Sequence, residues 1–419
     1  MKPKINSRWL RERYRVDVRK NLVWILLDHL CLVAVVGGAI VFDFWRSDEG
    51  LHWGWTAAVW GPAAVAVGAI QHRIGLMGHE ASHYLLHPNR KWNDVLAELF
   101  CFYPLFGTVA RYRAKHLKHH LYPNDPDRDP NLDGGKMERF YRHFPMTKRT
   151  FYLRHYLGFL WPPFVLSYLF DLIHVITLGG GAAAEVDRKR RAGSGPRLIA
   201  TGLGVLYVLL LVAALRTSNI HGIPLWIPLL GGYLLGLSGW SLLPSSAFFQ
   251  GANVAIPPRV LALLRLSFYT ALFGAFALTN RLTGYQTAPA FFLLWVFPLV
   301  YIFPYFMLVR EIFQHANAGT GTLDNSRVMH VGPIARWAVM GYGNDYHLIH
   351  HIYPKVPCYH LREVHEHLLD HATGYRDAVM ETEGFHRGRH GYASLLDSLA
   401  EETVEKQGAL AHHRADCGD

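Results

Sequence analysis

Long apolar stretches alternate with polar segments along the chain, and several are long enough to form membrane-spanning helices. A spanning helix needs about 20 mainly apolar residues, because the hydrocarbon core of a bilayer is about 30 Å thick. The sequence predicts spans over residues 21–42, 53–75, 198–215, 223–243, 260–278 and 289–309. Helices satisfy their own backbone polar groups in lipid. The pattern therefore predicts an all-α fold, a polytopic integral membrane helix bundle.

Two further apolar stretches do not fit a straight span. Residues 95–109 are too short once Glu98 is counted, and residues 151–178 carry Arg154 and Asp171. We interpret both as interfacial or re-entrant segments, which lie at the membrane surface or enter it without crossing.

Basic residues indicate which side of the membrane holds the polar segments. The first twenty residues are rich in Lys and Arg, and so is the segment between the second and third spans, which includes RKRR at residues 188–191. Each of the three loops on the other side holds one arginine. By the positive-inside rule, both termini are cytoplasmic. An even number of spans then places residues 79–120 and 347–351 on that same side.

Composition supports a membrane protein and adds one anomaly. Hydrophobic residues make up 51% of the chain and charged residues only 18%, whereas soluble domains carry about 25% charged residues. This balance excludes a disordered chain and an ordinary soluble enzyme. The four cysteines lie far apart, which excludes a disulfide scaffold, a zinc ribbon and an iron–sulfur cluster. The anomaly is histidine, with 26 of 419 residues.

Histidine boxes are the strongest chemical pattern in the sequence. An H-x-x-x-H box at residues 79–83 puts two imidazoles on one helical face. Two H-x-x-H-H boxes, at residues 116–120 and 347–351, do the same for three imidazoles each. A further histidine directly follows the last span. The candidate metal ligands are His79, His83, His116, His119, His120, His315, His347, His350 and His351.

This number of imidazoles exceeds what one ion binds and predicts two metal ions with four or five histidines each. Neutral imidazole binds Fe, Zn, Cu and Ni, and nitrogen-rich coordination leaves positions open for O₂. Ferritin-like proteins use Glu with Glu-x-x-His instead, a pattern that the sequence lacks. We expect the ring N–H groups of the ligand histidines to be held by nearby side chains, those of Asp129, Glu311, Asn344 and Asp345.

The other histidines show no comparable pattern. A single histidine more often has a structural or solvated role, and we interpret His155 in this way. His365, His367 and His371 lie on a predicted charged helix, and we interpret them as its solvated face.

Two other classes of protein compete with a two-metal enzyme. His79 and His83 with Glu80 between them fit H-E-x-x-H, the zinc protease motif in which Glu is general base. Residues 132–134 (LDG) look like the third-ligand segment of intramembrane zinc proteases. However, they lie in a polar stretch, and this interpretation leaves six box histidines without a role. A metal carrier needs polar groups inside the spans, for which residues 28–29 are thin evidence.

The boxes resemble those of the membrane fatty acid desaturase family, whose superfamily also contains hydroxylases and ketolases. The resemblance covers roughly residues 72–369 and rests on GHEASH at residues 78–83, HLKHH followed by DPD at residues 116–127, and NDYHLIHHIYPKVP at residues 344–357. The last segment is the most specific, since the family continues its third box with an aromatic residue, a proline and a short run to Val-Pro.

The resemblance assigns the metal ligands to the eight box histidines, with His315 as the extra histidine after the last span. Many relatives have a glutamate directly before that histidine. Here it is Gln314, so any role of the acid would pass to Glu311.

By this resemblance, the fold is a bundle of spanning helices, commonly four, under a cytoplasmic histidine-rich cap that holds two Fe ions. The reaction is the removal of two hydrogens from an acyl chain, as acyl-lipid or acyl-CoA, with O₂ and two electrons. Hydroxylation or ketolation of a lipid or carotenoid is the alternative. The expected layout is a basic segment (residues 1–20), a desaturase-like catalytic domain (residues 21–375) and a polar tail (residues 376–419).

Electrons are expected from a separate partner. The sequence has no cytochrome domain, no ferredoxin-type cysteine pattern and no G-x-G-x-x-G after a strand. Arg111, Arg113, Lys115 and Lys118 could steer an acidic ferredoxin or cytochrome, or could instead meet lipid headgroups. No nucleic acid is implied as a partner.

Overall fold

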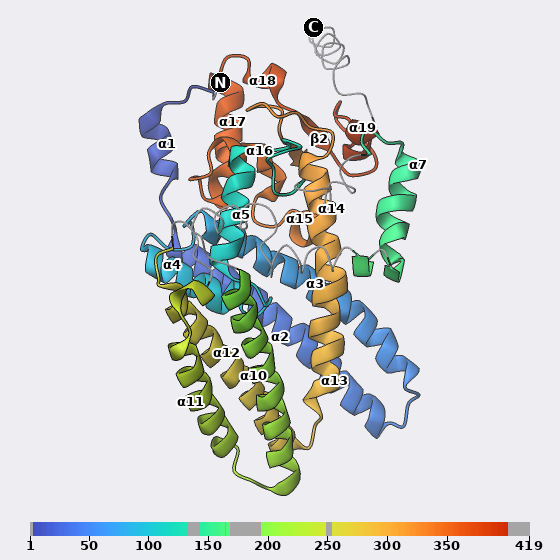
Figure 1. Cartoon of the computed structure of the whole chain (residues 1–419). Helices are drawn as coiled ribbons and strands as arrows, with labels where there is room; N and C mark the ends of the chain where they lie inside the picture. The colour runs from blue at the N-terminus through green and yellow to red at the C-terminus, as the bar shows by residue number, and fades with distance from the viewer. Residues whose placement is uncertain (1–2, 133–142, 164, 168–193, 249–253, 401–419) are drawn as a thin grey trace. The chain divides into compact units, whose positions relative to one another are not determined.

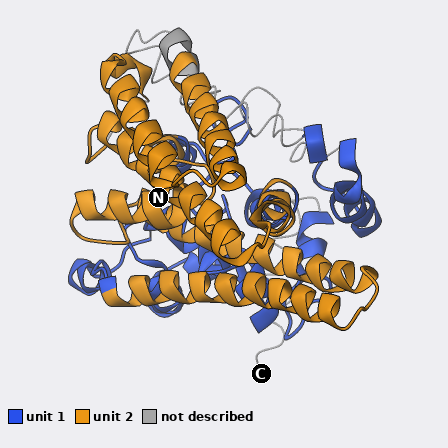
Figure 2. Cartoon of the chain, turned by 90° about the horizontal axis from the view of Figure 1, so that it is seen from below, with its two compact units in different colours: residues 1–18, 115–173, 301–419 blue, residues 19–114, 174–300 orange. Residues whose placement is uncertain are grey.

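The computed structural model describes residues 3–132, 143–163, 165–167, 194–248 and 254–400. Within them the chain is mostly helical, with one two-stranded parallel sheet (Figure 1). The chain forms two compact units that interleave along the sequence (Figure 2). Unit 1 comprises Met1–Val18, Lys115–Ile173 and Tyr301–Asp419, and unit 2 comprises Arg19–Ala114 and His174–Val300.

All the regular elements in the described part of unit 2 are helices. Its elements are α2 (Val18–Asp48), α3 (Gly54–Ser82), α4 (Arg90–Ala97), the π-helix η1 (Glu98–Phe102), the first residues of α5 (Val109–Leu121), α10 (Ser194–His221), α11 (Trp226–Leu242), η5 (Ser245–Ala247), α12 (Pro258–Thr283), α13 (Thr287–Phe291), η6 (Phe292–Val296) and the start of η7 (Pro298–Ile302).

Helices α10, α11 and α12 pack against one another (Figure 1). Gly236 on α11 permits the close approach, because a Cβ there would lie 2.9 Å from the Tyr207 ring of α10. α12 begins at Pro258, where a missing N–H costs nothing. It ends before Gly284, whose φ of 71° forms the left-handed cap that favours glycine.

Four helices of the described part are long and apolar enough to cross a membrane, whereas the sequence predicted six spans. The four are Val18–Asp48, Ile199–His221, Pro258–Thr283 and Thr287–His315. The other two predicted spans are also helical. α11 has 17 residues, a length of about 26 Å at 1.5 Å per residue, which is short for a bilayer core. In α3, polar Gln71 and His72 follow a run that is rich in glycine and alanine.

The two stretches predicted as interfacial are not continuous spans where they are described. Residues 95–109 contain the end of α4, η1 and a turn. Residues 151–178 begin in short helical turns, and their part beyond residue 167 lies outside the described residues.

Unit 1 contains shorter elements. They are α1 (Ser7–Arg13), the last residues of α5, α7 (Lys148–Phe151), η3 (Tyr152–Leu157), η4 (Gly158–Leu160), the end of η7, α14 (Phe303–His315), β1 (Val328–His330), α15 (Pro333–Ala338), η8 (Asn344–Tyr346), α16 (His347–Ile352), η9 (Cys358–His360), α17 (Leu361–His371), α18 (Tyr375–Ala378), β2 (Glu381–Glu383) and α19 (Leu395–Ala400).

The core of unit 1 surrounds α14. Ile312 and Phe313 are fully buried, and Phe151 and Leu395 pack in the same cluster. Residues 376–400, which we expected to be a polar tail, therefore belong in part to this core. Strand β2 pairs in parallel with β1, Met329 opposite Thr382. Residues 401–419 of the expected tail lie outside the described residues.

The expectation for His365 was wrong. Its side chain is buried, with Nε2 2.9 Å from Glu381 Oε1 and Nδ1 2.9 Å from the Tyr375 hydroxyl. These two partners come from the segment after α17. That segment covers the face of α17 that the sequence pattern alone marks as polar. His371 on the same helix is exposed, as predicted.

Candidate metal centre

Four histidines of unit 1 bring their ring nitrogens together. His119 comes from α5, His315 from the end of α14, and His347 and His351 from α16. All four are buried, and their ligand atoms lie within 4.8 Å of one another. The Nε2–Nε2 distances are 3.2 Å for His119–His315, 2.9 Å for His315–His347 and 3.2 Å for His347–His351. This arrangement confirms that the second and third boxes and His315 converge.

The outer ring nitrogens of two of these histidines show which tautomer the site favours. His119 Nδ1 lies 2.9 Å from Asp129 Oδ2, and His315 Nδ1 lies 3.0 Å from the Asn325 carbonyl. Both partners accept, so Nδ1 of each ring carries the proton. The Nε2 lone pairs then point into the cluster, which is the arrangement that a metal ion requires. The donor set therefore fits a bound transition metal.

Asp129 is a strong acceptor for this purpose. Burial opposes its charge, but His119 and the backbone N–H groups of Asn124 and Asn131 outweigh burial, and the pKa of Asp129 stays below its ordinary value. The carboxylate is therefore ionised at neutral pH. The sequence-based expectation that Asp129 holds a ring N–H is confirmed.

A second group of three histidines lies beside the first in unit 1. His120 Nε2 is 3.0 Å from both His116 Nε2 and His350 Nε2. The two groups adjoin, since the His120 and His351 rings stack with centroids 4.3 Å apart. Seven of the nine candidate ligands thus form two neighbouring groups within unit 1.

His79 and His83 lie in unit 2, at the end of α3. Their ring centroids are 5.5 Å apart, so the i, i+4 spacing places them on one face as predicted. Desolvation, together with the charge of Arg113, lowers the pKa of His83 to about 3. The imidazole is therefore neutral at physiological pH, which is the form that binds metals.

A buried ion pair closes the end of α3. Arg113 donates from Nε to the Ser82 carbonyl (2.9 Å) and from Nη2 to the Ala81 carbonyl (3.0 Å). Its Nη2 also lies 2.5 Å from Asp94 Oδ1. Arg113 is only 1% exposed, so the prediction that it belongs to a basic surface for an electron donor was wrong. It caps the carbonyls that follow His79 instead.

Three residues proposed to support the ligands have other described partners. Glu311 pairs with Arg310 and accepts from Asn131 at 3.4 Å. Asp345 pairs with Arg336 at 2.9 Å. The third, Asn344, accepts at its backbone carbonyl from Gln314 Nε2 at 2.9 Å. This last bond ties α14 to the turn before the third box, so Gln314 has a place in the site. An effect of Glu311, Asn344 and Asp345 on the ligands stays a prediction.

Two structural residues of the site were missed from the sequence. Arg327 is buried and donates to the Phe313, Ala316 and Asn317 carbonyls at the end of α14, next to His315. Gly343 has a φ of 69°, and a Cβ there would lie 2.6 Å from the Cys358 carbonyl oxygen. Only glycine fits this turn into the third box. The dipeptide Tyr-Gly before Asn344 could have suggested the turn, but nothing in the sequence marks Arg327.

Comparison with known proteins supports the pattern of the boxes. The family model described as fatty acid desaturase matches residues 53–250 and 224–383. The chain belongs to the fatty acid desaturase family. One curated relative is the dihydrorhizobitoxine desaturase of Bradyrhizobium elkanii, 42% identical over 119 residues. That match covers 28% of this chain and 30% of the relative.

Membership of the desaturase family bears on the competing zinc protease motif. All three histidine boxes and His315 lie inside the matched residues, whereas the protease interpretation uses only the first box. Asp133, which would be its third ligand, lies outside the described residues.

Proposed function

We propose that this desaturase-family protein is a membrane di-iron enzyme that introduces a C=C bond into an acyl chain. The observation that supports it most directly is the convergence of the ring nitrogens of His119, His315, His347 and His351, with the Nε2 lone pairs of His119 and His315 directed inward. The reaction balances as –CH₂–CH₂– + O₂ + 2e⁻ + 2H⁺ → –CH=CH– + 2H₂O. It is thus an oxidation of the chain coupled to the reduction of O₂.

We propose all nine histidines as iron ligands. One ion would be held by His119, His315, His347 and His351. The second would be held by His116, His120 and His350 together with His79 and His83, and we include these last two because of the family motif alone. When bound, the iron ions supply O₂ activation and hydrogen abstraction. The protein orients the imidazoles, through Asp129 and the Asn325 carbonyl in two cases.

The substrate class has two candidates. The family description favours a fatty acyl chain, carried as acyl-lipid or acyl-CoA. The partial identity with the Bradyrhizobium relative makes dihydrorhizobitoxine a second candidate. Hydroxylation or ketolation of a lipid or carotenoid remains the alternative reaction, since the same ligands serve those members of the superfamily.

We further propose that the protein is integral to the membrane, with both termini and the histidine boxes on the cytoplasmic side. The four apolar helices support membrane association. A separate ferredoxin or cytochrome would deliver the electrons. Arg111, Lys115 and Lys118 are each partly exposed and stay candidates for steering it.

Expression in a host of known lipid composition tests the proposal. Mass spectrometry should find acyl chains lighter by two hydrogens, which are absent with His347→Ala. The exposed His371→Ala is the matched control and should keep activity. Extracts supplied with dihydrorhizobitoxine test the second substrate in parallel. A product heavier by one oxygen would indicate hydroxylation in place of desaturation. No change in either substrate, with iron-loaded protein and a working electron donor, would contradict both reactions.

A further inference from the structure

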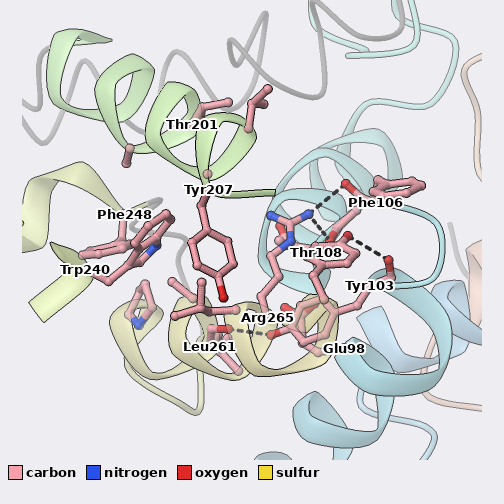
Figure 3. A pocket seen from close by; sticks show the side chains of 18 of the residues that line it. Glu98, Tyr103, Phe106, Thr108, Thr201, Tyr207, Trp240, Phe248, Leu261 and Arg265 are labelled. Atoms are coloured by element: carbon pink, nitrogen blue, oxygen red, sulfur yellow. Dashed lines mark hydrogen bonds between the residues drawn. The ribbon is translucent and has the colours of Figure 1, made fainter. Parts of the chain in front are cut away.

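A cavity of about 440 Å³ is lined by residues of unit 2 (Figure 3). Its walls come from the middle of α10 (residues 200–209), the first turns of α12, the end of α11 with residues 247–248, and residues 98–111. The volume lies in the range of small-molecule sites, about 300–1,000 Å³. Nothing in the desaturase assignment uses this cavity.

One wall holds a buried carboxyl group with an unsatisfied oxygen. Glu98 is 0% exposed. Its Oε1 accepts from the Val109 N–H at 3.1 Å, whereas Oε2 has no hydrogen-bond partner among the described residues. An unsatisfied buried polar group costs free energy, because it has lost its hydrogen bonds to water. A ligand in the cavity that bonds to Oε2 would recover this energy.

The charge of the cavity indicates the sign of that ligand. Burial raises the pKa of Glu98 to about 8, so at neutral pH the carboxyl carries a proton and can donate it. Arg265 and Arg111 line the same cavity. Arg265 Nη2 donates to the Phe106 and Gly107 carbonyls at 2.8 and 2.9 Å, which holds the guanidinium in place. Two cations beside a neutral acid favour an anion.

The rest of the lining is apolar and aromatic. Tyr207, Trp240 and Phe248 face Arg265 across the cavity in Figure 3. An aromatic wall beside a carboxyl group could also suit an ammonium ion, but the two arginines oppose a cation. The site therefore combines a small anion-binding end with a larger apolar end.

We propose that this cavity binds an amphiphile with a free carboxylate head, with the head between Glu98 and Arg265 and the alkyl chain along Tyr207, Trp240 and Phe248. The carboxylate accepts from the Glu98 hydroxyl and from the Arg265 guanidinium. This is a binding site for a fatty-acid-like anion, and it requires neither the metal ions nor turnover.

Calorimetry on the full chain in a nonionic detergent tests the site. Decanoate should bind with one-to-one stoichiometry, at least tenfold more tightly than decanol or decyltrimethylammonium. Arg265→Gln should weaken decanoate binding at least tenfold, while Arg216→Gln, an exposed arginine on α10, should not. Metal-free protein should bind equally well, so failure here would leave the proposed desaturase function untouched.

A pair of glycines on α10 supplies a steric test. Gly204 lines the cavity and Gly202 has no atom within 4 Å of its Cβ position. Gly204→Leu should abolish decanoate binding and Gly202→Leu should preserve it, with thermal melting confirming that both variants fold. Equal binding by both leucine variants would overturn the site. Tighter binding of decanol, decyltrimethylammonium or decyl phosphate than of decanoate would overturn the carboxylate assignment.

Discussion

The imidazole of His119 illustrates how single residues prepare the candidate metal centre. Its Nδ1–H faces an ionised carboxylate of Asp129, and this leaves Nε2 as the donor atom toward His315. An imidazole held in this way is a better ligand, because the carboxylate fixes its tautomer and raises its basicity. The proposed chemistry therefore depends on residues that never contact the metal.

Substitution of Asp129 tests this dependence. In Asp129→Asn the neutral amide no longer polarises His119, and metal affinity should fall by about 10–100-fold. Competition with a chelator measures the affinity. Asp127→Asn, an exposed acid two residues away, should bind metal like the wild type. Equal affinities of all three proteins would show that Asp129 does not support the ligand.

Glu98 makes stability depend on pH. Its pKa is about 8 in the folded protein against an ordinary value of 4.5. Between these two pH values the folded state holds a proton that the unfolded state has released. The free energy of unfolding should therefore fall as pH rises from about 4.5 to 8. Glu98→Gln should lose that part of the slope. Melting temperatures in detergent from pH 5 to 8 measure it, and parallel profiles would contradict the burial of an unpaired carboxyl.

At the scale of elements, the end of α3 depends on the Arg113–Asp94 pair. Both side chains are almost fully buried, and the arginine caps the Ala81 and Ser82 carbonyls after the first histidine box. Removing one partner of a buried pair leaves an uncompensated charge, whereas removing both leaves none. We therefore expect loss of either partner to destabilise the helix end that holds His79 and His83, and loss of both partners to cost less than the two single losses together.

A double-mutant cycle tests this element. Arg113→Met and Asp94→Leu should each lower the free energy of unfolding by about 3–5 kcal/mol. The double variant should lose clearly less than the sum of the two. Arg90→Met, whose exposed guanidinium lies over the Tyr84 ring, is the control and should change stability little. Additive losses in the cycle would mean that the two residues act independently.

Local spacing predicted the ligands better than it predicted their surroundings. The i, i+3 and i, i+4 spacings brought His116, His119 and His120 into the observed groups because helical periodicity is a local property. The burial of Arg113 and His365 was missed because their partners, Asp94 and Glu381, lie 19 and 16 residues away. No periodicity within one helix can indicate which distant carboxylate will cover it.

At the scale of the whole molecule, apolar length predicted where the helices lie better than which of them span. Every predicted span is helical, but α3 and α11 do not meet the length and hydropathy of a spanning helix. Six spans place the segment after α3 and the segment after α14 on one side. The four apolar helices alone would place them on opposite sides, because only α2 precedes the first segment and all four precede the second. The proposal that all histidine boxes share one membrane face therefore requires that α3 and α11 cross the membrane as well.

Reporter fusions test that orientation. A reporter fused after residue 191 should be cytoplasmic, as should reporters at both termini, because the positive-inside rule places the basic segments there. A fusion after residue 221, beyond α10, is the control and should report the opposite side. An external reporter at residue 191 would contradict the common face.

The central claim is that nine histidines hold two iron ions, and metal content tests it most directly. Protein expressed with iron and purified anaerobically should contain about two Fe per chain by mass spectrometry. His347→Ala, which removes one ligand of the four-histidine group, should lower this value, and His371→Ala should not. Iron at or below one per chain in the wild type, with zinc filling the site, would contradict the account.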